Sequence, residues 1–227
     1  MRTKTIGILG GLGPVASSRF YEMLNGMCAA GCDQDYPDVL LYSKASVPDR
    51  TAHLLGRGES PLPAMVEGLQ VLERAGAGVI AIPCATAHHF YDELQACVNV
   101  PVLDMLELTA KALKKAKVTR AALLATEGSY ASGAFCRALE NAGITAIVPA
   151  ETKALMELIY AIKLGRQPES IANFAEPLFA RGAQNVILGC TELSVFANQD
   201  ARYIDPMRIL AQEILCRSRT SLNTLTK

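Results

Sequence analysis

The chain has 227 residues, half of them hydrophobic and 19% charged, which excludes a disordered chain and suits one or two domains with a real core. Its 22 Lys and Arg residues balance its 22 Asp and Glu residues, so no basic surplus indicates nucleic acid or a membrane surface as a partner. No apolar run approaches the roughly 18 residues of a membrane-spanning helix, and the N-terminal sequence lacks a signal-peptide pattern, so a cytoplasmic protein is expected.

Short apolar runs bounded by Gly or Pro alternate along the chain with longer segments of helical periodicity. Strands are predicted at residues 5–9, 39–42, 79–83, 102–103, 121–125, 144–148 and 186–188. Helices are predicted near residues 15–30, 60–75, 89–97, 106–116, 132–142, 151–164, 168–181 and 206–219. The last helix begins at Asp205-Pro206, an N-cap followed by Pro at the first helical position. The alternation is typical of an α/β fold, and the continuously apolar strands indicate parallel sheets covered on both faces.

A weak internal repeat predicts two similar lobes. Residues 75–90 align with residues 181–196, and both segments place a cysteine, Cys84 or Cys190, where an apolar strand stops. We therefore expect two lobes, each a mostly parallel sheet flanked by helices, with the active site in the cleft between them. The first lobe would comprise residues 1–104 plus 205–227, with the last helix packed back on it, and the second lobe residues 105–204.

The two repeated cysteines are the strongest candidates for chemistry. Ligands of open parallel sheets bind outside the carboxyl ends of the strands, where Cys84 and Cys190 are predicted to lie. A free thiol has a pKa of about 8.5, so modest stabilisation of the thiolate makes it a useful base near neutral pH. The alternative is that both are small buried hydrophobic residues, which is the interpretation for the other cysteines of the seven.

A glycine-rich turn, GLGPVA at residues 11–16, follows the first predicted strand. Its G-x-G-x-x-A pattern matches a dinucleotide-binding fingerprint, but the second strand ends without the acid that would hold the ribose. A nucleotide-dependent oxidoreductase is therefore a competing interpretation. We favour a turn that brings backbone N–H groups and a helix N-terminus to a carboxylate.

Four further polar residues are considered for the site. Arg50 in the VPDRT segment offers a planar fork suited to a carboxylate, or it is a solvated loop residue. Lys163 ends a predicted helix, a position that favours Lys in any case. His88 follows Cys84 and either tunes its thiolate, contacts substrate or packs the helix. Glu192 either orients the second site, accepts a proton or binds backbone N–H groups.

Five motifs, taken in order, resemble the aspartate racemases, within the wider aspartate/glutamate/hydantoin racemase superfamily. They are IGILGGLGP near the N-terminus, VPDRT near residue 50, IPCATAH around Cys84, IYAIKLG around Lys163 and ILGCTEL around Cys190. The resemblance runs over nearly the whole chain. It implies an amino-acid racemase, a homodimer, in which Cys84 and Cys190 form the catalytic acid/base pair without pyridoxal phosphate, another cofactor or a metal.

The resemblance also implies which residues bind the small-molecule substrate, aspartate or glutamate. Arg50 and Lys163 would hold its carboxylates, and the turns and strand ends around the cysteines would supply hydrogen bonds. The expected substrate-binding residues are Leu12, Arg50, Ala85, Thr86, Thr126, Lys163 and Thr191, with His88 and Glu192 as candidate supporting residues.

Two residues depart from the patterns of the relatives. Ala85 stands where members of the family usually carry Asn, which removes a side-chain donor and acceptor beside the substrate. Glu192 stands where glutamate racemases typically carry His, which favours the aspartate-type branch or an enzyme that acts on either acid. Alternatives on the same fold are a cysteine-dependent maleate isomerase or malonate decarboxylase, and an amino-acid-binding protein without catalysis. The presence of both cysteines argues against a decarboxylase and against a protein that has lost its activity.

Overall fold

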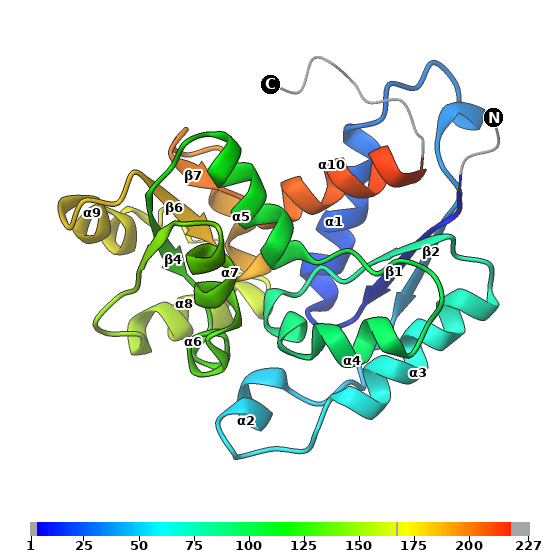
Figure 1. Ribbon diagram of the computed structural model, residues 1–227, viewed down its shortest axis with the longest axis horizontal. Coiled ribbons are helices and arrows are strands. Elements are labelled where there is room, and N and C mark those ends of the chain that lie inside the picture. Colours follow the sequence, from blue (N-terminus) through cyan, green and yellow to red (C-terminus); the bar gives the residue numbers. More distant parts are fainter. Residues whose placement is uncertain (1–3, 167, 219–227) are drawn as a thin grey trace.

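The computed structural model describes residues 4–166 and 168–218, which form two parallel sheets covered by helices (Figure 1). The strands are β1 (Ile6–Gly10), β2 (Val39–Ser43), β3 (Val79–Ala81), β4 (Arg120–Leu124), β5 (Thr145–Ile147), β6 (Asn185–Leu188) and β7 (Tyr203–Ile204). The α-helices are α1 (Pro14–Gly26), α2 (Arg50–Leu54), α3 (Leu62–Arg74), α4 (Tyr91–Ala96), α5 (Met105–Lys115), α6 (Glu127–Ser132), α7 (Ala134–Asn141), α8 (Lys153–Lys163), α9 (Ala172–Ala180) and α10 (Pro206–Ser218). Three 3-10 helices are η1 (Asp33–Asp35), η2 (Ala85–Phe90) and η3 (Thr191–Phe196).

The two sheets repeat one strand arrangement. The first sheet has the order β2-β1-β3, and the second has the order β5-β4-β6 with β7 added at its edge, all in parallel pairs. In each sheet the strand after which a cysteine follows, β3 or β6, lies beside the central strand. Cys84 and Cys190 then each begin a 3-10 helix of six residues. The predicted α/β class with two similar lobes is confirmed.

Several predicted elements differ in detail. The segment at 102–103 forms only an isolated bridge between Val102 and Ile80. The predicted helix at 132–142 corresponds to α7, but α6, which precedes it, was not predicted; the two meet at Gly133 in a left-handed conformation with φ of 65°. The helix predicted at 15–30 ends at Gly26. The apolar pattern does not predict β7 or α2, which are too short to leave a periodicity, and residue 219 lies outside the described residues.

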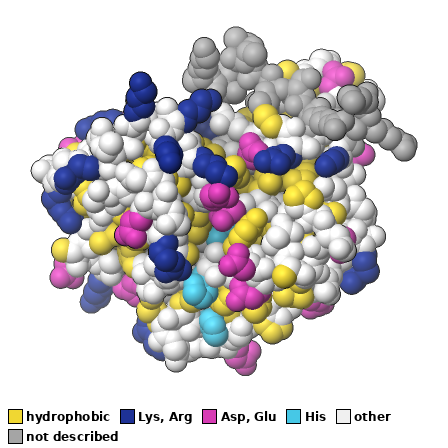
Figure 2. All heavy atoms as spheres, in the orientation of Figure 1, with side chains coloured by type: hydrophobic (Ala, Val, Ile, Leu, Met, Phe, Trp, Pro, Cys, Tyr) yellow, Lys and Arg dark blue, Asp and Glu magenta, His cyan; other side chains and the backbone are white. Residues whose placement is uncertain are grey.

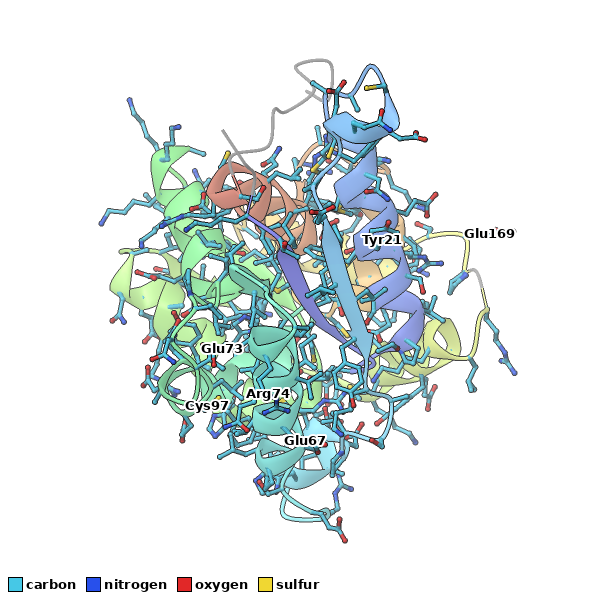
Figure 3. All side chains as sticks on the ribbon, turned by 90° about the vertical axis from the view of Figure 1, so that its right-hand side faces the viewer. Tyr21, Glu67, Glu73, Arg74, Cys97 and Glu169 are labelled. Carbon is cyan, nitrogen blue, oxygen red and sulfur yellow. The ribbon has the colours of Figure 1, made fainter. Side chains whose placement is uncertain are left out.

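The strand β2 is not covered on both faces as predicted. It lies at the edge of the first sheet, and Leu41 is 39% exposed. The central strand β1 and its other neighbour, β3, are buried, because α1 and α3 lie on opposite faces of this sheet. Figure 3 shows Tyr21 on α1 and Glu73 and Arg74 on α3 on the two sides of the strands.

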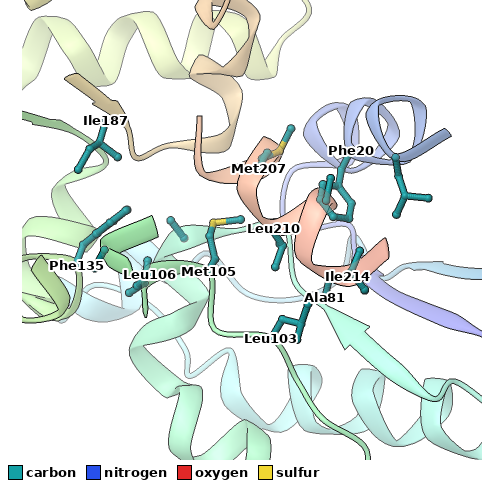
Figure 4. Packing of buried hydrophobic residues seen from close by; sticks show 14 of the residues in the cluster. Phe20, Ala81, Leu103, Met105, Leu106, Phe135, Ile187, Met207, Leu210 and Ile214 are labelled. Atoms are coloured by element: carbon teal, nitrogen blue, oxygen red, sulfur yellow. The ribbon is translucent and has the colours of Figure 1, made fainter. Parts of the chain in front are cut away.

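Helices α5 and α10 pack together between the two sheets and join them through one apolar core. In Figure 4, Met207, Leu210 and Ile214 of α10 lie between Phe20 of α1 and the residues of the second lobe. The same cluster reaches Ile187 on β6, so the lobes share a core. The last helix does pack on α1 and β3 of the first lobe, as predicted, but it packs on α5 as well.

The surface agrees with the balanced composition. Figure 2 shows Lys and Arg side chains and Asp and Glu side chains spread over the same face of the molecule. Within the described part of the chain, no helix has the length and apolar character needed to cross a membrane.

Candidate active site

A small buried cavity contains both repeated cysteines. Cys84 and Cys190 are free, buried thiols, and the cavity has a volume of about 20 Å³, which is room for about one water molecule. Its other lining residues are Leu12, Asp49, Arg50, Thr51, Ala85, Thr86, Thr126, Lys163, Gly189, Thr191 and Glu192. The structure therefore brings together every predicted site residue except His88.

The thiol of Cys190 has a carboxylate beside it. Its Sγ donates a hydrogen bond of 3.0 Å to Oε2 of Glu192, which is itself buried. Burial raises the pKa of Cys190 well above its ordinary value, the negative charge of Glu192 adds to this effect, and Lys163 opposes it. Cys190 is therefore a protonated thiol near neutral pH.

Three buried hydroxyl groups connect the lobes beside the cysteines. Oγ1 of Thr86 lies 2.9 Å from Oγ1 of Thr126 and 2.9 Å from Oγ of Ser129. Thr126 also caps α6, because its side chain accepts a hydrogen bond from the N–H of Ser129. The sequence analysis missed Ser129, although the spacing of Thr126 and Ser129 is that of a helix N-cap.

Arg50 directs the end of its guanidinium to backbone carbonyl groups. Its Nη1 donates to the carbonyl oxygens of Val47 and Pro48, and its Nη2 donates to that of Leu12 at 2.8 Å. The buried guanidinium thus holds the turn after β1 against the loop before α2. Among the three nitrogen atoms of the Arg50 guanidinium, only Nε has no hydrogen-bond partner in the described part of the chain. The three bonds leave the Nε–H and one Nη2–H of the guanidinium without a partner, and the predicted contact of Arg50 with a substrate carboxylate stays a prediction.

Lys163, the last residue of α8, is the cation that faces the site. Burial acts to lower its pKa, but the negative charges of Glu192, Cys190, Cys84 and Asp49 outweigh burial and raise the pKa above its ordinary value. The ammonium group therefore stays charged throughout the neutral range. Lys163 thus ends helix α8 and also lines the cavity of the cysteines.

His88 supports the backbone, in agreement with the packing alternative. Its Nδ1 lies 3.0 Å from the carbonyl oxygen of Cys84, and its Nε2 lies 3.2 Å from that of Leu103. Both ring nitrogens thus face backbone oxygens and not the cavity. His88 fixes the strand end that carries Cys84 against the segment before α5.

The side chain of Glu192 lies against the glycine-rich turn. Gly13 has a φ of 137°, and a Cβ added to it would lie 2.6 Å from Oε1 of Glu192. Oε1 of Glu192 therefore lies beside this turn, and the predicted contact of the turn with a carboxylate of the substrate stays a prediction. A second cavity of about 230 Å³ adjoins the turn and shares Asp49, Arg50, Lys163 and Glu192 with the cysteine cavity.

The family model for Asp/Glu/hydantoin racemases matches residues 9–214. The chain belongs to this family. The racemase is therefore an enzyme of the isomerase class, and its membership supports racemisation of an amino acid as the reaction. Among the residues described, no group of three or more His, Cys, Asp or Glu side chains is arranged to hold a metal ion.

Individual relatives agree with this assignment. The racemase is 30% identical over 197 residues to the broad specificity amino-acid racemase RacX of Bacillus subtilis, covering 83% of this chain and 86% of the relative. It is 30% identical to the solved aspartate racemase of Picrophilus torridus, with a TM-score of 0.87 over 97% of this chain and 96% of that one. A glutamate racemase from Francisella tularensis, solved with D-glutamate, shares the fold at 16% identity, with a TM-score of 0.68 over 100% of this chain and 86% of that chain.

Proposed function

We propose that this racemase interconverts the enantiomers of an acidic amino acid, aspartate or glutamate, by proton transfer through Cys84 and Cys190. The proposal rests mainly on one observation: two free buried thiols, one following a strand of each sheet, line a single cavity together with Lys163. Inversion at the α-carbon requires a base on one face and an acid on the other. Two lobes that each contribute one thiol supply both.

The proposed reaction starts with Cys84 as thiolate and Cys190 as thiol. The thiolate of Cys84 removes the α-proton, so an S–H bond forms as the C–H bond breaks and the electron pair is delocalised into the α-carboxylate. Cys190 then transfers its proton to the opposite face of the α-carbon and becomes the thiolate. The hydrogen bond from Cys190 to Glu192 supports this starting assignment. The reverse reaction exchanges the two roles.

The carbanion needs stabilisation, because an α-proton is far less acidic than a thiol. Each tenfold gain in rate requires about 1.4 kcal/mol of transition-state stabilisation. Lys163 contributes a fixed positive charge, Arg50 contributes its unpaired Nε, and Thr86, Thr126 and Thr191 contribute hydroxyl groups to the same cavity. Preorganised charges and donors in a buried site act more strongly than they would in water.

The second buried thiol favours racemisation over the alternatives on this fold. Decarboxylation of a malonate needs a single proton donor, whereas here two thiols share one cavity. Ala85 contributes no polar side-chain atom, so substrate recognition at this strand end would depend on the backbone and on the adjacent hydroxyl of Thr86.

The decisive experiment is proton NMR of L-aspartate and of L-glutamate with the reduced enzyme in heavy water. A two-base mechanism predicts that deuterium appears at the α-carbon of the D-isomer while the remaining L-isomer keeps its proton at early times. Equal early labelling of both isomers would indicate a single base. Absence of exchange with either acid would contradict the proposed function.

Assembly as a homodimer, which the resemblance to the aspartate racemases implies, and a cytoplasmic location, which the sequence pattern favours, remain predictions. Light scattering coupled to gel filtration measures the mass in solution, for which we expect twice the 24.3 kDa of one chain. Fractionation of the source cells with an antibody against the racemase measures the location.

A further inference from the structure

Two residues that line the cavity of the two cysteines each carry an unpaired polar atom, one a hydrogen-bond donor and the other an acceptor. Among the residues that the structure describes, Nε of Arg50 and Oε1 of Glu192 are buried and have no hydrogen-bond partner. Buried polar atoms in native proteins are almost always paired. An unpaired donor and an unpaired acceptor at one site therefore point to a ligand that carries both an acceptor and a donor.

The carboxylate of Glu192 is held in a fixed position. Its Oε2 accepts hydrogen bonds from Sγ of Cys190 at 3.0 Å and from Oγ1 of Thr191 at 3.4 Å. Its Oε1 reaches Gly13, where the missing side chain leaves room for it. The residue is only 4% exposed, so its carboxylate is largely shielded from bulk water.

The chemistry of a carboxylate oxygen limits what can bind it. The oxygen accepts hydrogen bonds, so its partner is a donor, and a cationic donor bonds most strongly. Lys163 lies close enough to interact with Glu192 electrostatically, yet no ion pair joins the two within the described part of the chain. A dicarboxylate without an amino group would bring only further negative charge to Oε1.

We propose that Oε1 of Glu192 accepts a hydrogen bond from the α-ammonium group of the substrate while Oε2 holds the thiol of Cys190. This inference rests on the proposed function, because it places the α-carbon beside the two cysteines. One carboxylate then fixes the distance between the ammonium group and the proton donor. The site thus selects free α-amino acids over diacids and over amino acids whose amino group is acylated.

Binding of the ammonium group also changes the proton donor. In the free enzyme the negative charge of Glu192 adds to the effect of burial and keeps the proton on Cys190. A cation on Oε1 offsets that charge and makes Cys190 a stronger acid when substrate is present. The other titratable or charged groups that face this pair are Lys163 from α8, Cys84 after β3, Tyr130 from α6, and Asp49 and Arg50 at the start of α2.

Calorimetric titration with matched ligand pairs tests the proposal. L-Aspartate and succinate, and L-glutamate and glutarate, differ within each pair only in the amino group. We expect the wild-type enzyme to prefer the amino acid, and Glu192→Gln to reduce the preference at least about tenfold. Glu127→Gln is the matched control, because Glu127 bonds Thr152 outside the cysteine cavity, and it should keep the wild-type preference.

A second readout separates recognition from a merely structural role. We expect Glu192→Gln to lower the pH at which iodoacetamide alkylates Cys190, followed by mass spectrometry of the peptide, since a nearby negative charge is lost. An unchanged preference and an unchanged alkylation profile would overturn the proposal. If the variant does not fold, equal binding of aspartate and succinate by the wild-type enzyme would overturn it. Deuterium exchange by the wild-type enzyme tests the proposed function independently.

Discussion

The hydroxyl oxygens of Thr86 and Thr126 lie 2.9 Å apart, although the two residues follow strands of different sheets. Both threonines line the cavity of the cysteines, which has a volume of only about 20 Å³. An amino acid is larger than the about one water molecule that fits there. We therefore expect the site to widen when substrate binds, either into the adjoining cavity of about 230 Å³ or by a parting of the lobes at these threonines. Thr126 keeps Ser129 as a partner at 3.1 Å when Thr86 moves away, so opening leaves no hydroxyl of the second lobe unpaired.

The two threonines should differ in their effect on stability. Thr126→Val removes the N-cap of α6 together with hydroxyl contacts, and we expect a loss of about 1–2 kcal/mol in the free energy of unfolding. Thr86→Val leaves the pair of Thr126 and Ser129 intact and should cost less, about 1 kcal/mol or below. Urea unfolding of both variants measures the difference. A larger loss in Thr86→Val would contradict the capping role.

Replacement of either site cysteine should abolish racemisation without unfolding the chain. Cys84→Ser and Cys190→Ser each retain the size of the side chain but lose its acidity, and we expect turnover to fall at least about 100-fold. The exposed Cys216 on α10 provides the control, because Cys216→Ser should keep full activity. Polarimetry and circular dichroism measure turnover and folding. Near-wild-type turnover in either site variant would refute the two-base mechanism.

The two basic residues of the site should separate into a binding role and a structural role. Lys163→Met removes the charge at the cavity and should raise KM for an acidic substrate about tenfold or more with a smaller effect on stability. Arg50→Lys cannot satisfy the three carbonyl groups that the guanidinium binds, so it should cost about 1–3 kcal/mol of stability. Steady-state kinetics and urea unfolding of both variants test this division. Equal losses of stability would show that it is wrong.

The racemase should lose stability at alkaline pH. Burial and the charge of Glu192 raise the pKa of Cys190 above the ordinary thiol value of about 8.5. Above that pH the unfolded chain releases a proton that the folded protein retains, so the free energy of unfolding falls as pH rises. Urea unfolding at about pH 8 and pH 10 should show a smaller fall in Cys190→Ser than in the wild type or Cys216→Ser. The fall should not vanish, because burial also raises the pKa of Cys28 and Cys136.

Gly13 should be essential for the position of Glu192. Gly13→Ala places a methyl group 2.6 Å from Oε1 of Glu192 and should displace the carboxylate. Gly76→Ala is the control, since Gly76 also has a positive φ, of 97°, but nothing lies within 4 Å of an added Cβ. We expect both variants to lose some stability through backbone strain and only Gly13→Ala to lose activity. If Glu192→Ala does not relieve the clash in a double-mutant cycle, the predicted contact is incorrect.

Much of the fold was predictable because its signals are local. Apolar runs bounded by Gly or Pro predicted strands β1 to β6, and the repeat around Cys84 and Cys190 predicted two equivalent strand ends. Short elements such as α2 and β7 leave no periodicity in the sequence. Their positions depend on tertiary contacts, for example the cap that Asp49 provides to α2 through the N–H of Ala52.

The residues that line the candidate site could largely be predicted from the sequence, whereas the direction in which each side chain points could not. Residue type and motif order brought Lys163 and Glu192 into the prediction, and both line the cavity. Sequence could not show that Arg50 turns its fork to backbone carbonyls, because those acceptors lie up to 38 residues away. Nor could it show that His88 faces Leu103, a contact across the sheet edge.

The core around α5 and α10 has a thermodynamic consequence for the whole chain. Because Leu210 and Ile214 pack in one cluster with residues of both sheets, neither lobe can lose its structure without exposing apolar surface of the other. We therefore expect the two lobes to unfold together and not as independent domains. The proposed substrate cleft then lies between two lobes that we expect to unfold as one unit.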